Sequence, residues 1–476
     1  MAAIGRAKVR GVALLPCVGL ASALGLAHCG AFDSSVAGAP DASAEGAADA
    51  PQVDGAVAAD ASADGGDASG PPCVIVDGGA HGVVDTTYQN GLHFTGAQSF
   101  AVRGGTIDAQ GRVHVVGFAG GCAGNGLDLA AVRLTPDGAL DTGYGGTTKP
   151  RACVDFGNDD VAWGAAVDQK GRLVIAGVAR KAAASATVTV VRLTEAGQLD
   201  ATFNAVGTPG KLSFLPPQNT ADRYAAFGVA VDGNDIVVVG GNNDLENSPA
   251  APSEGFVVRL TEAGALDPSF VARLDNDVVG YWAAAPVGGG RLLVAGTLRV
   301  FPPSYGVRLL ERDGSLVKSF GVDGTASATV TGGDVRATDV GVAADGTIFV
   351  SGTNDGKATT ARFDGNGKLD RAFATSGVHV ETSMASNYAF HRPLRVQCDG
   401  KVILGGDVPA QQPRLMRLTA GGAPDPAFGS GGTLELVNDA GFVGLGVVLT
   451  DPRDGKILFV GGQPGDPGPW VYRVLP

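Results

Sequence analysis

The sequence predicts an all-β protein, a seven-bladed β-propeller of four-stranded blades that is closed by an N-terminal strand joining the C-terminal blade. The first observation behind this prediction is composition: 75 of the 476 residues are glycine, without a collagen-like period, and only 17% are charged. The second is a repeated pair of apolar runs, and the third is the complementarity of the two chain ends. A fixed repeat is considered before any single residue, because it defines the architecture.

The first 29 residues are predicted to be an export signal. Arg6, Lys8 and Arg10 precede a run of small and apolar residues at positions 12–27. A membrane-spanning helix is the alternative, but the run is shorter than the roughly 20 apolar residues that such a helix needs. The run also contains Pro16. We therefore expect export rather than a membrane span.

Residues 26–29, Leu-Ala-His-Cys, resemble a bacterial lipobox. The resemblance implies that Cys29 is lipidated and that the protein is held at the cell envelope by a lipid anchor. Gly30 after the cysteine resembles lipoproteins sent onward to an outer membrane, so an outer-membrane lipoprotein is expected. His28 departs from the small residue that is usual before the cysteine, and cleavage after Ala23 by an ordinary signal peptidase stays the alternative.

Residues 30–72 are predicted to be a disordered tether. They consist almost entirely of Ala, Asp, Gly, Ser and Pro, and they carry eight acidic and no basic side chains. Such a segment cannot bury enough apolar area to offset its chain entropy. The remaining domain, residues 73–476, holds 40 acidic and 32 basic side chains. Nucleic acid is not an expected partner, because this balance lacks the basic surface that phosphate binding requires.

The domain at residues 73–476 contains seven copies of one repeat. Each copy has an apolar run that ends in Gly, followed by a second run that contains Arg. The glycines are Gly117, Gly177, Gly240, Gly296, Gly352, Gly406 and Gly461, and the arginines are Arg133, Arg192, Arg259, Arg308, Arg362, Arg417 and Arg473. The first and last arginines are 340 residues apart, which gives about 57 residues per repeat. We expect the arginine to serve the structure of each blade.

Four strands are predicted within each repeat. In the second repeat, apolar or alternating runs at residues 163–168, 173–177, 188–194 and 211–215 are bounded by turn residues. Asp-Gly pairs in the equivalent turns of other repeats, such as Asp345-Gly346, supply the positive φ of a two-residue hairpin. Each repeat therefore predicts one antiparallel sheet.

A Leu-Asp-x-x-Phe motif, or a near variant of it, follows the third strand. In Asp267-Pro-Ser-Phe270 the Asp is expected to cap a single helical turn, with Pro at its first position. The Leu and the Phe are expected to hold that turn against the core. The fourth repeat departs from the motif, because Val317 stands where Asp is expected, so this cap is not predicted there.

The two ends of the chain supply complementary parts of one repeat. Residues 84–88 match the capped turn and residues 92–95 match a fourth strand, but no first three strands precede them. The last repeat, residues 442–475, has the first three strands and then stops. Pairing the two ends removes exposed sheet edges, so the sequence predicts a closed ring rather than an open solenoid.

The repeats resemble those of the delta-60 repeat family of bacterial β-propellers. The resemblance rests on Asp168-Gln-Lys-Gly-Arg-Leu-Val-Ile-Ala-Gly177 and on Val191-Arg-Leu-Thr-Glu-Ala-Gly-Gln-Leu-Asp200-Ala-Thr-Phe203, and it covers residues 83–476. It implies the propeller fold. It implies no particular chemistry, because the family largely lacks an assigned activity.

Motifs of catalysis and metal binding are scarce in the sequence. The chain has no G-x-S-x-G, H-E-x-x-H or P-loop motif, and its histidines are not at ligand spacing. Residues 364–370 imitate the start of a calcium loop, but Thr375 stands where the loop needs a Glu. We expect neither a cofactor nor a metal ion.

The segments that enter the inner strands are the predicted binding surface, because loops on one face of a rigid scaffold commonly carry function. The predicted binding residues are Trp163, Arg223, Tyr224, Tyr281, Trp282, Arg336, Asp339, Tyr388, His391 and Arg392. Trp, Tyr and Arg are the residue types enriched at binding hot spots. The same segments hold Phe100, Arg103, Asp160 and Phe442. Packing between blades is the alternative for about half of these residues, above all for Phe100, Trp163 and Phe442.

Two classes of function are consistent with these residues. The favoured one is a monomeric, envelope-anchored binding or scaffold module for a protein, peptide or glycan. The alternative is a propeller enzyme, a lyase, glycosidase or quinoprotein-like dehydrogenase, in which Asp160, Asp339, His391 or Arg392 would supply acid, base or carboxylate-binding groups. Carboxylates that converge in an open channel would favour the enzyme.

Four cysteines are left once Cys17 is removed with the signal and Cys29 is lipidated. Export to an oxidising compartment favours disulfides. We predict that Cys122 pairs with Cys153, because both belong to the first blade, and that Cys73 pairs with Cys398. Four buried thiols are the alternative.

Overall fold

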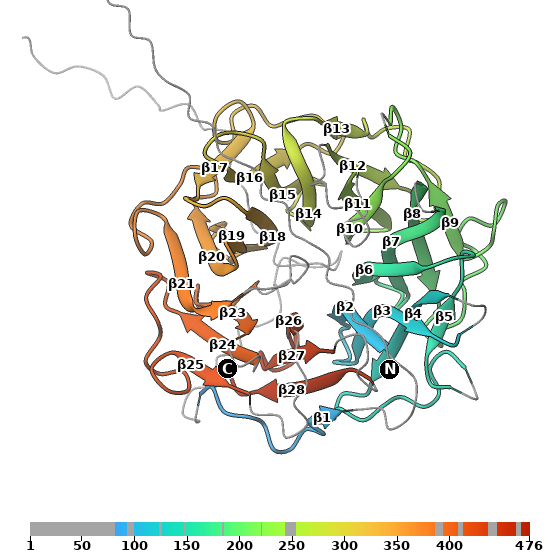
Figure 1. Cartoon of the computed structure of the whole chain (residues 1–476), viewed down its shortest axis with the longest axis horizontal. Helices are drawn as coiled ribbons and strands as arrows, with labels where there is room; N and C mark the ends of the chain where they lie inside the picture. Colours follow the sequence, from blue (N-terminus) through green and yellow to red (C-terminus); the bar gives the residue numbers. More distant parts are fainter. Residues whose placement is uncertain are drawn as a thin grey trace, which may run out of the picture. The chain divides into compact units, whose positions relative to one another are not determined.

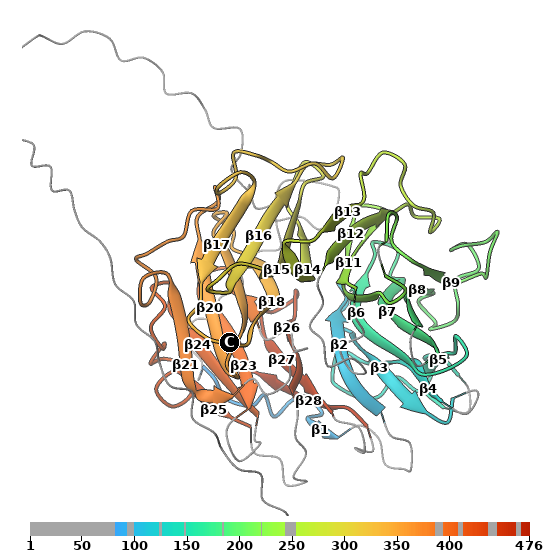
Figure 2. The same ribbon diagram turned by 45° about the horizontal axis from the view of Figure 1, so that its top comes forward.

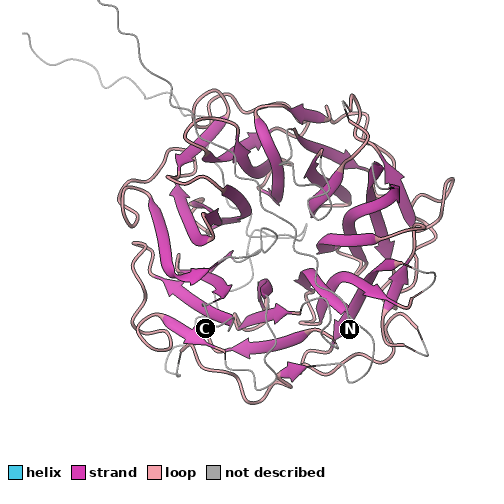
Figure 3. Ribbon diagram, in the orientation of Figure 1, coloured by secondary structure: helices cyan, strands magenta, loops and turns pink. Residues whose placement is uncertain are grey.

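The computed structural model describes residues 81–92, 100–122, 126–146, 149–182, 185–219, 221–242, 254–385, 394–407, 413–436, 445–462 and 468–476. Within these ranges the chain forms seven four-stranded antiparallel blades around a common axis and contains no helix (Figures 1 and 3). The predicted fold class is confirmed. The predicted export signal and tether lie outside the described residues, and among the described residues no helix is long and apolar enough to cross a membrane.

The blades follow the chain in order, and each strand pairs with its neighbours in sequence. Blade one has β2 (Phe100–Ile107), β3 (Val113–Gly120), β4 (Leu127–Leu134) and β5 (Ala152–Val154), and blade two has β6 (Asp160–Val167), β7 (Leu173–Ala182), β8 (Ser185–Leu193) and β9 (Lys211–Phe214). Blade three has β10 (Ala225–Asp232), β11 (Asp235–Gly241), β12 (Gly255–Leu260) and β13 (Arg273–Asp275), and blade four has β14 (Val278–Pro286), β15 (Leu292–Leu298), β16 (Ser304–Leu310) and β17 (Thr325–Thr329).

The remaining three blades complete the ring. Blade five has β18 (Val335–Val342), β19 (Ile348–Asn354), β20 (Lys357–Phe363) and β21 (Val378–Ala385), and blade six has β22 (Leu394–Val396), β23 (Val402–Asp407), β24 (Pro413–Leu418) and β25 (Thr433–Glu435). Blade seven has β26 (Leu445–Thr450), β27 (Ile457–Gly461), β28 (Trp470–Val474) and β1 (Gly91–Leu92). The first strand of each blade lies nearest the axis, and the sheets stand side by side around it (Figures 1 and 2).

The apolar runs of the middle strands are continuous because each sheet is covered on both faces by its neighbours. Strand β11 illustrates this arrangement. Val237 and Val239 belong to the apolar cluster shared with blade four, whereas Val238 between them belongs to the cluster shared with blade two. Neither face of the sheet needs polar residues, so the strand does not alternate in hydrophobicity.

The N-terminal strand closes the ring. Strand β1 pairs antiparallel with β28, with Gly91 opposite Val471 and Leu92 opposite Trp470. The chain before β1 adds main-chain hydrogen bonds, from Asp85 N to Arg473 O and from Leu475 N to Val83 O. Blade seven therefore takes three strands from the C-terminus and one from the N-terminus, as the complementary ends predict.

The first strand of a blade, which lies nearest the axis, is called its inner strand. In blades one to five and in blade seven the inner strand carries a β-bulge opposite the recurrent glycine. In blade one the register shifts between Val102 and Gly104, so Arg103 has no partner on β3. A Cβ at Gly117 would lie 1.8 Å from the carbonyl oxygen of Ala101, and one at Gly177 would lie 2.0 Å from that of Val161. The glycine is therefore required because the bulged strand approaches it too closely for any side chain.

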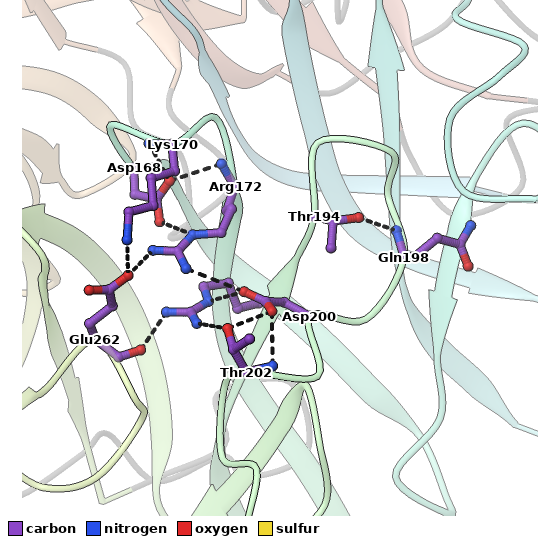
Figure 4. A network of polar contacts seen from close by, with 9 residues as sticks. Asp168, Lys170, Arg172, Thr194, Gln198, Asp200, Thr202 and Glu262 are labelled. Atoms are coloured by element: carbon purple, nitrogen blue, oxygen red, sulfur yellow. Dashed lines mark hydrogen bonds and ion pairs between the residues drawn. The ribbon is translucent and has the colours of Figure 1, made fainter.

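The recurrent arginine joins neighbouring blades, and Arg192 is a typical case. Its Nε donates to Asp200 at 2.7 Å, its guanidinium lies 5.0 Å over Phe203, and it also donates to the main-chain carbonyl of Glu262 in blade three. Figure 4 shows Asp200 and Glu262 in this network, with Arg172 bridging Asp168 and Glu262. Five other arginines lie 4.5–5.1 Å over their motif aromatic: Arg133, Arg259, Arg362, Arg417 and Arg473.

The capped turn differs from the prediction in two respects. It is a hydrogen-bonded turn and not a helical one: Phe203 N donates to Asp200 O, and the Asp200 carboxylate accepts the Thr202 N–H. The motif Phe is buried, but the motif Leu is only partly covered, since Leu199 is 42% and Leu266 is 45% exposed. In other blades Leu140, Leu316 and Leu369 are partly buried and pack against the core as predicted. The Leu therefore contributes in some blades only, whereas the aromatic also lies beneath the arginine.

In blade five the hairpin between the first two strands is longer than predicted, whereas in blade three Asp232 pairs with Asp235 and leaves the predicted two-residue loop. Gly346 has a positive φ of 83°, as the Asp-Gly pair implies. However, Ala343 N donates to Thr347 O, and Gly346 N donates to Ala343 O, so three residues and not two form the loop. The Gly adopts positive φ at the end of a turn, where a residue with a Cβ would be strained.

Blade four solves the loss of its motif Asp differently. Val317 is buried in the position of the Asp, and Arg308 donates instead to the Tyr281 hydroxyl at 3.0 Å and pairs with Asp275 at 3.1 Å and with Asp277. The charge of Arg308 is therefore compensated by carboxylates from blade three, namely from its outer strand β13 and from the loop that follows β13.

The structure contains the Cys122–Cys153 disulfide, with the two Cα atoms 5.8 Å apart. Cys398 also takes part in a disulfide. Cys73, which we predict as its partner, lies outside the described residues, so that pairing stays a prediction.

Candidate functional site

The residues to be considered lie on the top face, which we define as the face at which the inner strands β2, β6, β10, β14 and β18 begin. The bulge leaves a residue without a partner on the second strand near the start of each of these strands, and β14 has a further irregularity between Val278 and Tyr281. The bulged residues are Arg103, Trp163, Phe227, Trp282 and Thr338, and Gly446 holds the same place in blade seven. The bulge thus decides which side chain each inner strand presents here.

Four aromatic side chains, Phe118, Trp163, Phe227 and Trp282, form what we call the aromatic cluster. They belong to one buried apolar group that extends over blades one to four. The rings of Phe227 and Trp282 are stacked, with centroids 4.3 Å apart and planes 15° apart. The group contains residues of the inner strands of all four blades, together with Phe118 of β3, Val178 of β7 and Ala186 of β8.

Arg103 lies over the end of the aromatic cluster. Its guanidinium is 4.9 Å from the centroid of Phe118 and 5.5 Å from that of Trp163, and the residue is partly exposed. A guanidinium at this distance is attracted by the ring quadrupole. The sequence pattern therefore places a partly accessible cation beside large, rigid apolar surfaces.

Tyr224 and Tyr281, two of the predicted binding residues, are buried between blades. The Tyr224 hydroxyl donates to Glu254 at 3.0 Å, and the Tyr281 hydroxyl donates to Asp275 at 2.7 Å. Burial raises the pKa of Tyr281 well above its ordinary value, so this hydroxyl remains a donor. Phe100 is buried too, in the cluster shared by blades one and seven.

The other predicted binding residues are scattered. Arg336 is paired with Asp334 at 2.9 Å on the surface. Asp339 is buried and accepts from Arg395 at 3.2 Å and from Leu394 N at 3.3 Å. Arg223 is partly buried before β10. Tyr388, His391, Arg392 and Phe442 lie outside the described residues. The described part thus brings together Trp163 and Trp282, but not the arginines and acids predicted beside them.

Three carboxylates converge where blade one meets blade two, and we call them the aspartate cluster: Asp128, Asp155 and Asp160. One oxygen from each lies within 4.8 Å of those of the other two. Asp160 is 0% and Asp128 is 1% exposed. Burial, together with the carboxylates of Asp155 and Asp128, raises the pKa of Asp160 to about 7, although a hydrogen bond from Phe156 N and the charge of Lys211 lower it.

Residues 364–370, whose sequence is similar to the start of a calcium loop, do not bring three carboxylates together in this way. The Asp364 carboxylate accepts the main-chain N–H groups of Asn366 at 3.0 Å and Lys368 at 2.8 Å, within an ordinary turn. Asp370 is paired with Arg362.

Phe118, Phe227, Asp128 and Asp155 were not among the residues that the sequence singles out. Phe227 could have been found by aligning the repeats on the recurrent glycine, because it precedes Gly240 by 13 residues and Trp163 precedes Gly177 by 14. Asp128 and Asp155 carry no such signal, since Asp128 lies on β4, Asp155 follows β5, and both meet Asp160 only through the stacking of two blades.

Three segments of the chain, residues 111–144, 171–203 and 397–428, match a family described as a beta-propeller domain of unknown function (DUF5122). Each segment runs from the first hairpin of a blade to the motif aromatic. No curated protein matches the chain. Among solved structures the chain is similar to one titled "Structure of Dos1 propeller", with 9% sequence identity over 82% of this chain and 95% of that chain and a TM-score of 0.44.

The family matches fall in blades one, two and six, and the same arginine, aromatic and bulge recur in blades between them. The chain is therefore a seven-bladed β-propeller whose repeats are similar to those of the DUF5122 beta-propeller family.

Proposed function

We propose that the protein is a binding or scaffold module that presents the top face of its propeller to a protein, peptide or glycan. The observation that carries the proposal is Arg103 at the edge of the aromatic cluster, which unites the inner strands of four successive blades. Arg is enriched at binding hot spots because it offers planar donors. Trp163 and Trp282 are themselves buried, at 3% and 5% exposure, so they would support Arg103 from beneath. A partner held here would contact Arg103 first.

The same bulge position is small or polar in blades five and seven, the two other blades in which the described residues include it. Thr338 occupies it in blade five, and Gly446 occupies it in blade seven. The proposed recognition surface is therefore asymmetric and is concentrated on blades one to four.

The described acids do not favour the enzyme alternative. Asp160 is wholly buried, so its neighbours do not make an open catalytic site, and Asp339 is engaged by Arg395. A general acid or base must reach the proton that it transfers.

The binding proposal can be tested by crosslinked pull-down from cell-envelope extract with the purified full chain. Arg103→Ala is expected to reduce recovery of the partner at least about fivefold, which corresponds to a loss of roughly 1 kcal/mol at a hot spot. Arg371→Ala is the matched control, because Arg371 is exposed in the loop between the third and fourth strands of blade five, away from the top face. Equal recovery with both variants, at unchanged melting temperature, would contradict the proposal.

We also propose that the N-terminal segment exports the chain and anchors it through a lipid on Cys29, with residues 30–72 as the tether and the outer membrane as the destination. The lipobox-like sequence supports this assignment. Metabolic labelling with a fatty acid should mark the wild type and Cys17→Ser but not Cys29→Ser. Label on Cys29→Ser, or none on the wild type, would refute lipidation at that residue.

A further inference from the structure

We infer that Asp128, Asp155 and Asp160 bind a calcium ion at the joint between blades one and two. Asp128 lies near the start of β4, Asp155 follows β5, and Asp160 begins β6. The three segments come from two blades, and one carboxylate oxygen of each lies within 4.8 Å of the other two. A single cation could therefore be shared by all three residues without a change in the course of the strands.

The arrangement of Asp160 points to a ligand. Its Oδ2 accepts the Phe156 N–H at 2.6 Å, but its Oδ1 is buried and accepts no hydrogen bond from any residue in the described ranges. A buried carboxylate oxygen without a partner is costly, and two further carboxylates beside it increase the cost. A bound cation would satisfy that oxygen and compensate the like charges.

Two basic side chains near the cluster, Lys211 and Arg151, donate to main-chain carbonyls, and Arg151 also interacts electrostatically with Asp128. Lys211 Nζ donates to Asp155 O at 2.7 Å and lies 4.8 Å over the Phe156 ring. Arg151 donates to Gly120 O at 3.1 Å and to Gly121 O at 3.4 Å. They reduce the negative potential of the site, but these hydrogen bonds are directed to carbonyl oxygens and not to Asp160 Oδ1.

The chemistry of the donors favours calcium. The donors are all carboxylate oxygens, which hard cations prefer, and no His or Cys belongs to the described cluster, as a zinc site would require. Ca²⁺ accepts six to eight oxygens in irregular geometry, whereas Mg²⁺ demands a near-ideal octahedron. Three carboxylates brought together from separate segments therefore suit calcium, with water or carbonyl oxygens completing its coordination.

A calcium ion here would connect the outer and middle strands of blade one to the inner strand of blade two. Asp160 begins the strand that carries Trp163, and the Cys122–Cys153 disulfide constrains Cys153, two residues before Asp155. The ion and the disulfide would thus both constrain the segment around β5 in blade one. This inference does not depend on the proposed binding function.

The test uses the purified full chain after removal of metals with a chelator. Addition of about 1 mM CaCl₂ is expected to raise the melting temperature by about 2–5 °C, because an ion that binds only the folded state stabilises it by mass action. Titration calorimetry with CaCl₂ should show one site, and the same concentration of MgCl₂ should give a smaller shift.

Two variants assign the effect to the cluster. Asp160→Asn keeps the shape of the buried side chain, and Asp155→Asn changes a partly exposed one, so both are expected to fold and to lose the calcium response. Asp323→Asn is the matched control, because it removes an exposed carboxylate at a φ of 51°, which Asn adopts readily. This control should respond like the wild type.

Three results would overturn the inference. They are a wild type without a calcium response, a response that survives in both cluster variants, and a magnesium response equal to that of calcium. If calcium does not stabilise the wild type and the Asp160→Asn substitution raises the melting temperature, then a proton shared by the carboxylates satisfies the cluster instead.

Discussion

At the scale of single residues, the recurrent glycine determines the shape of the inner strand. The carbonyl oxygen two residues before the bulge occupies the place of a Cβ in blades one, two, three, four and five, at 1.8–2.4 Å. The bulge in turn exposes Arg103, Trp163, Phe227 and Trp282 to one another across blades. In the sequence the recurrent glycine is only the last residue of an apolar run. In the structure it is required for the bulge, and therefore for the proposed binding surface.

Gly177→Ala should destabilise the protein by roughly 2–4 kcal/mol, because its Cβ would lie 2.0 Å from the Val161 carbonyl oxygen and the backbone would have to move. Urea unfolding measures the change in the free energy of unfolding. Gly143→Ala is the control, since the nearest atom to its Cβ would be 3.5 Å away. A cost within about 0.5 kcal/mol for both substitutions would show that the close approach is not required.

At the scale of the element, the arginine, the motif Asp and the motif aromatic form one joint between neighbouring blades. Arg417 illustrates its demands: it is buried, its Nε donates to Asp425 at 2.8 Å, and its guanidinium lies 4.9 Å over Phe428. Blade four shows that the Asp can be replaced only where other carboxylates, here Asp275 and Asp277, reach the arginine.

Asp425→Val should reduce the free energy of unfolding by about 3 kcal/mol, because it leaves Arg417 buried without its carboxylate. Chemical denaturation checks the value. The double variant with Arg417→Met should recover part of the loss, since no unpaired charge remains, and the cycle isolates the coupling of the two residues. Additive losses in the double variant would contradict a coupled joint.

At the scale of the whole molecule, the ring depends on pairing between residues almost 400 positions apart. Asp85 holds Arg473 at 3.0 Å and Lys456 at 3.0 Å, and Arg473 lies 4.5 Å from the Tyr88 centroid. Blade seven therefore uses the same joint as the other blades, although its parts come from opposite ends of the chain.

Deletion of residues 1–97 should destabilise the propeller by roughly 3 kcal/mol or more, because β28 loses its partner strand and Arg473 loses Asp85. Deletion of residues 1–72 should leave the melting temperature close to that of the full chain. Calorimetric scans of the two truncated proteins make the comparison. Equal melting temperatures would contradict closure by the N-terminal strand.

The closure should also be sensitive to acid. Burial raises the pKa of Asp85, but hydrogen bonds from Thr87 and the positive charges of Lys456 and Arg473 outweigh burial and hold the pKa below its ordinary value. The resulting stabilisation is fully present above about pH 4, the unfolded pKa of Asp, and is lost as the pH falls below it. The melting temperature of the wild type should therefore fall more steeply than that of Asp85→Asn between about pH 5 and pH 3. Parallel pH profiles would rule out this role for Asp85.

The sequence by itself determined the repeat, the number of blades, the closure and the Cys122–Cys153 pair. The repeat and the number of blades follow from local patterns, because residues equivalent to Gly177 and Arg192 recur in each repeat. The closure follows from the two chain ends, which together supply one complete blade without an exposed sheet edge. The exact form of the turns was not determined, because Asp-Gly chemistry allows hairpins of two and of three residues, and the exposure of Leu199 depends on its surroundings.

Only the tertiary structure decided which side chains meet. The pairing of Arg103 with Trp163, and of Phe227 with Trp282, requires the bulge geometry and the stacking of neighbouring sheets. The aspartate cluster is the clearest case, since its three residues stand in different segments of two blades. No spacing within the sequence encodes that contact, because it is created by the angle and distance at which one blade packs on the next.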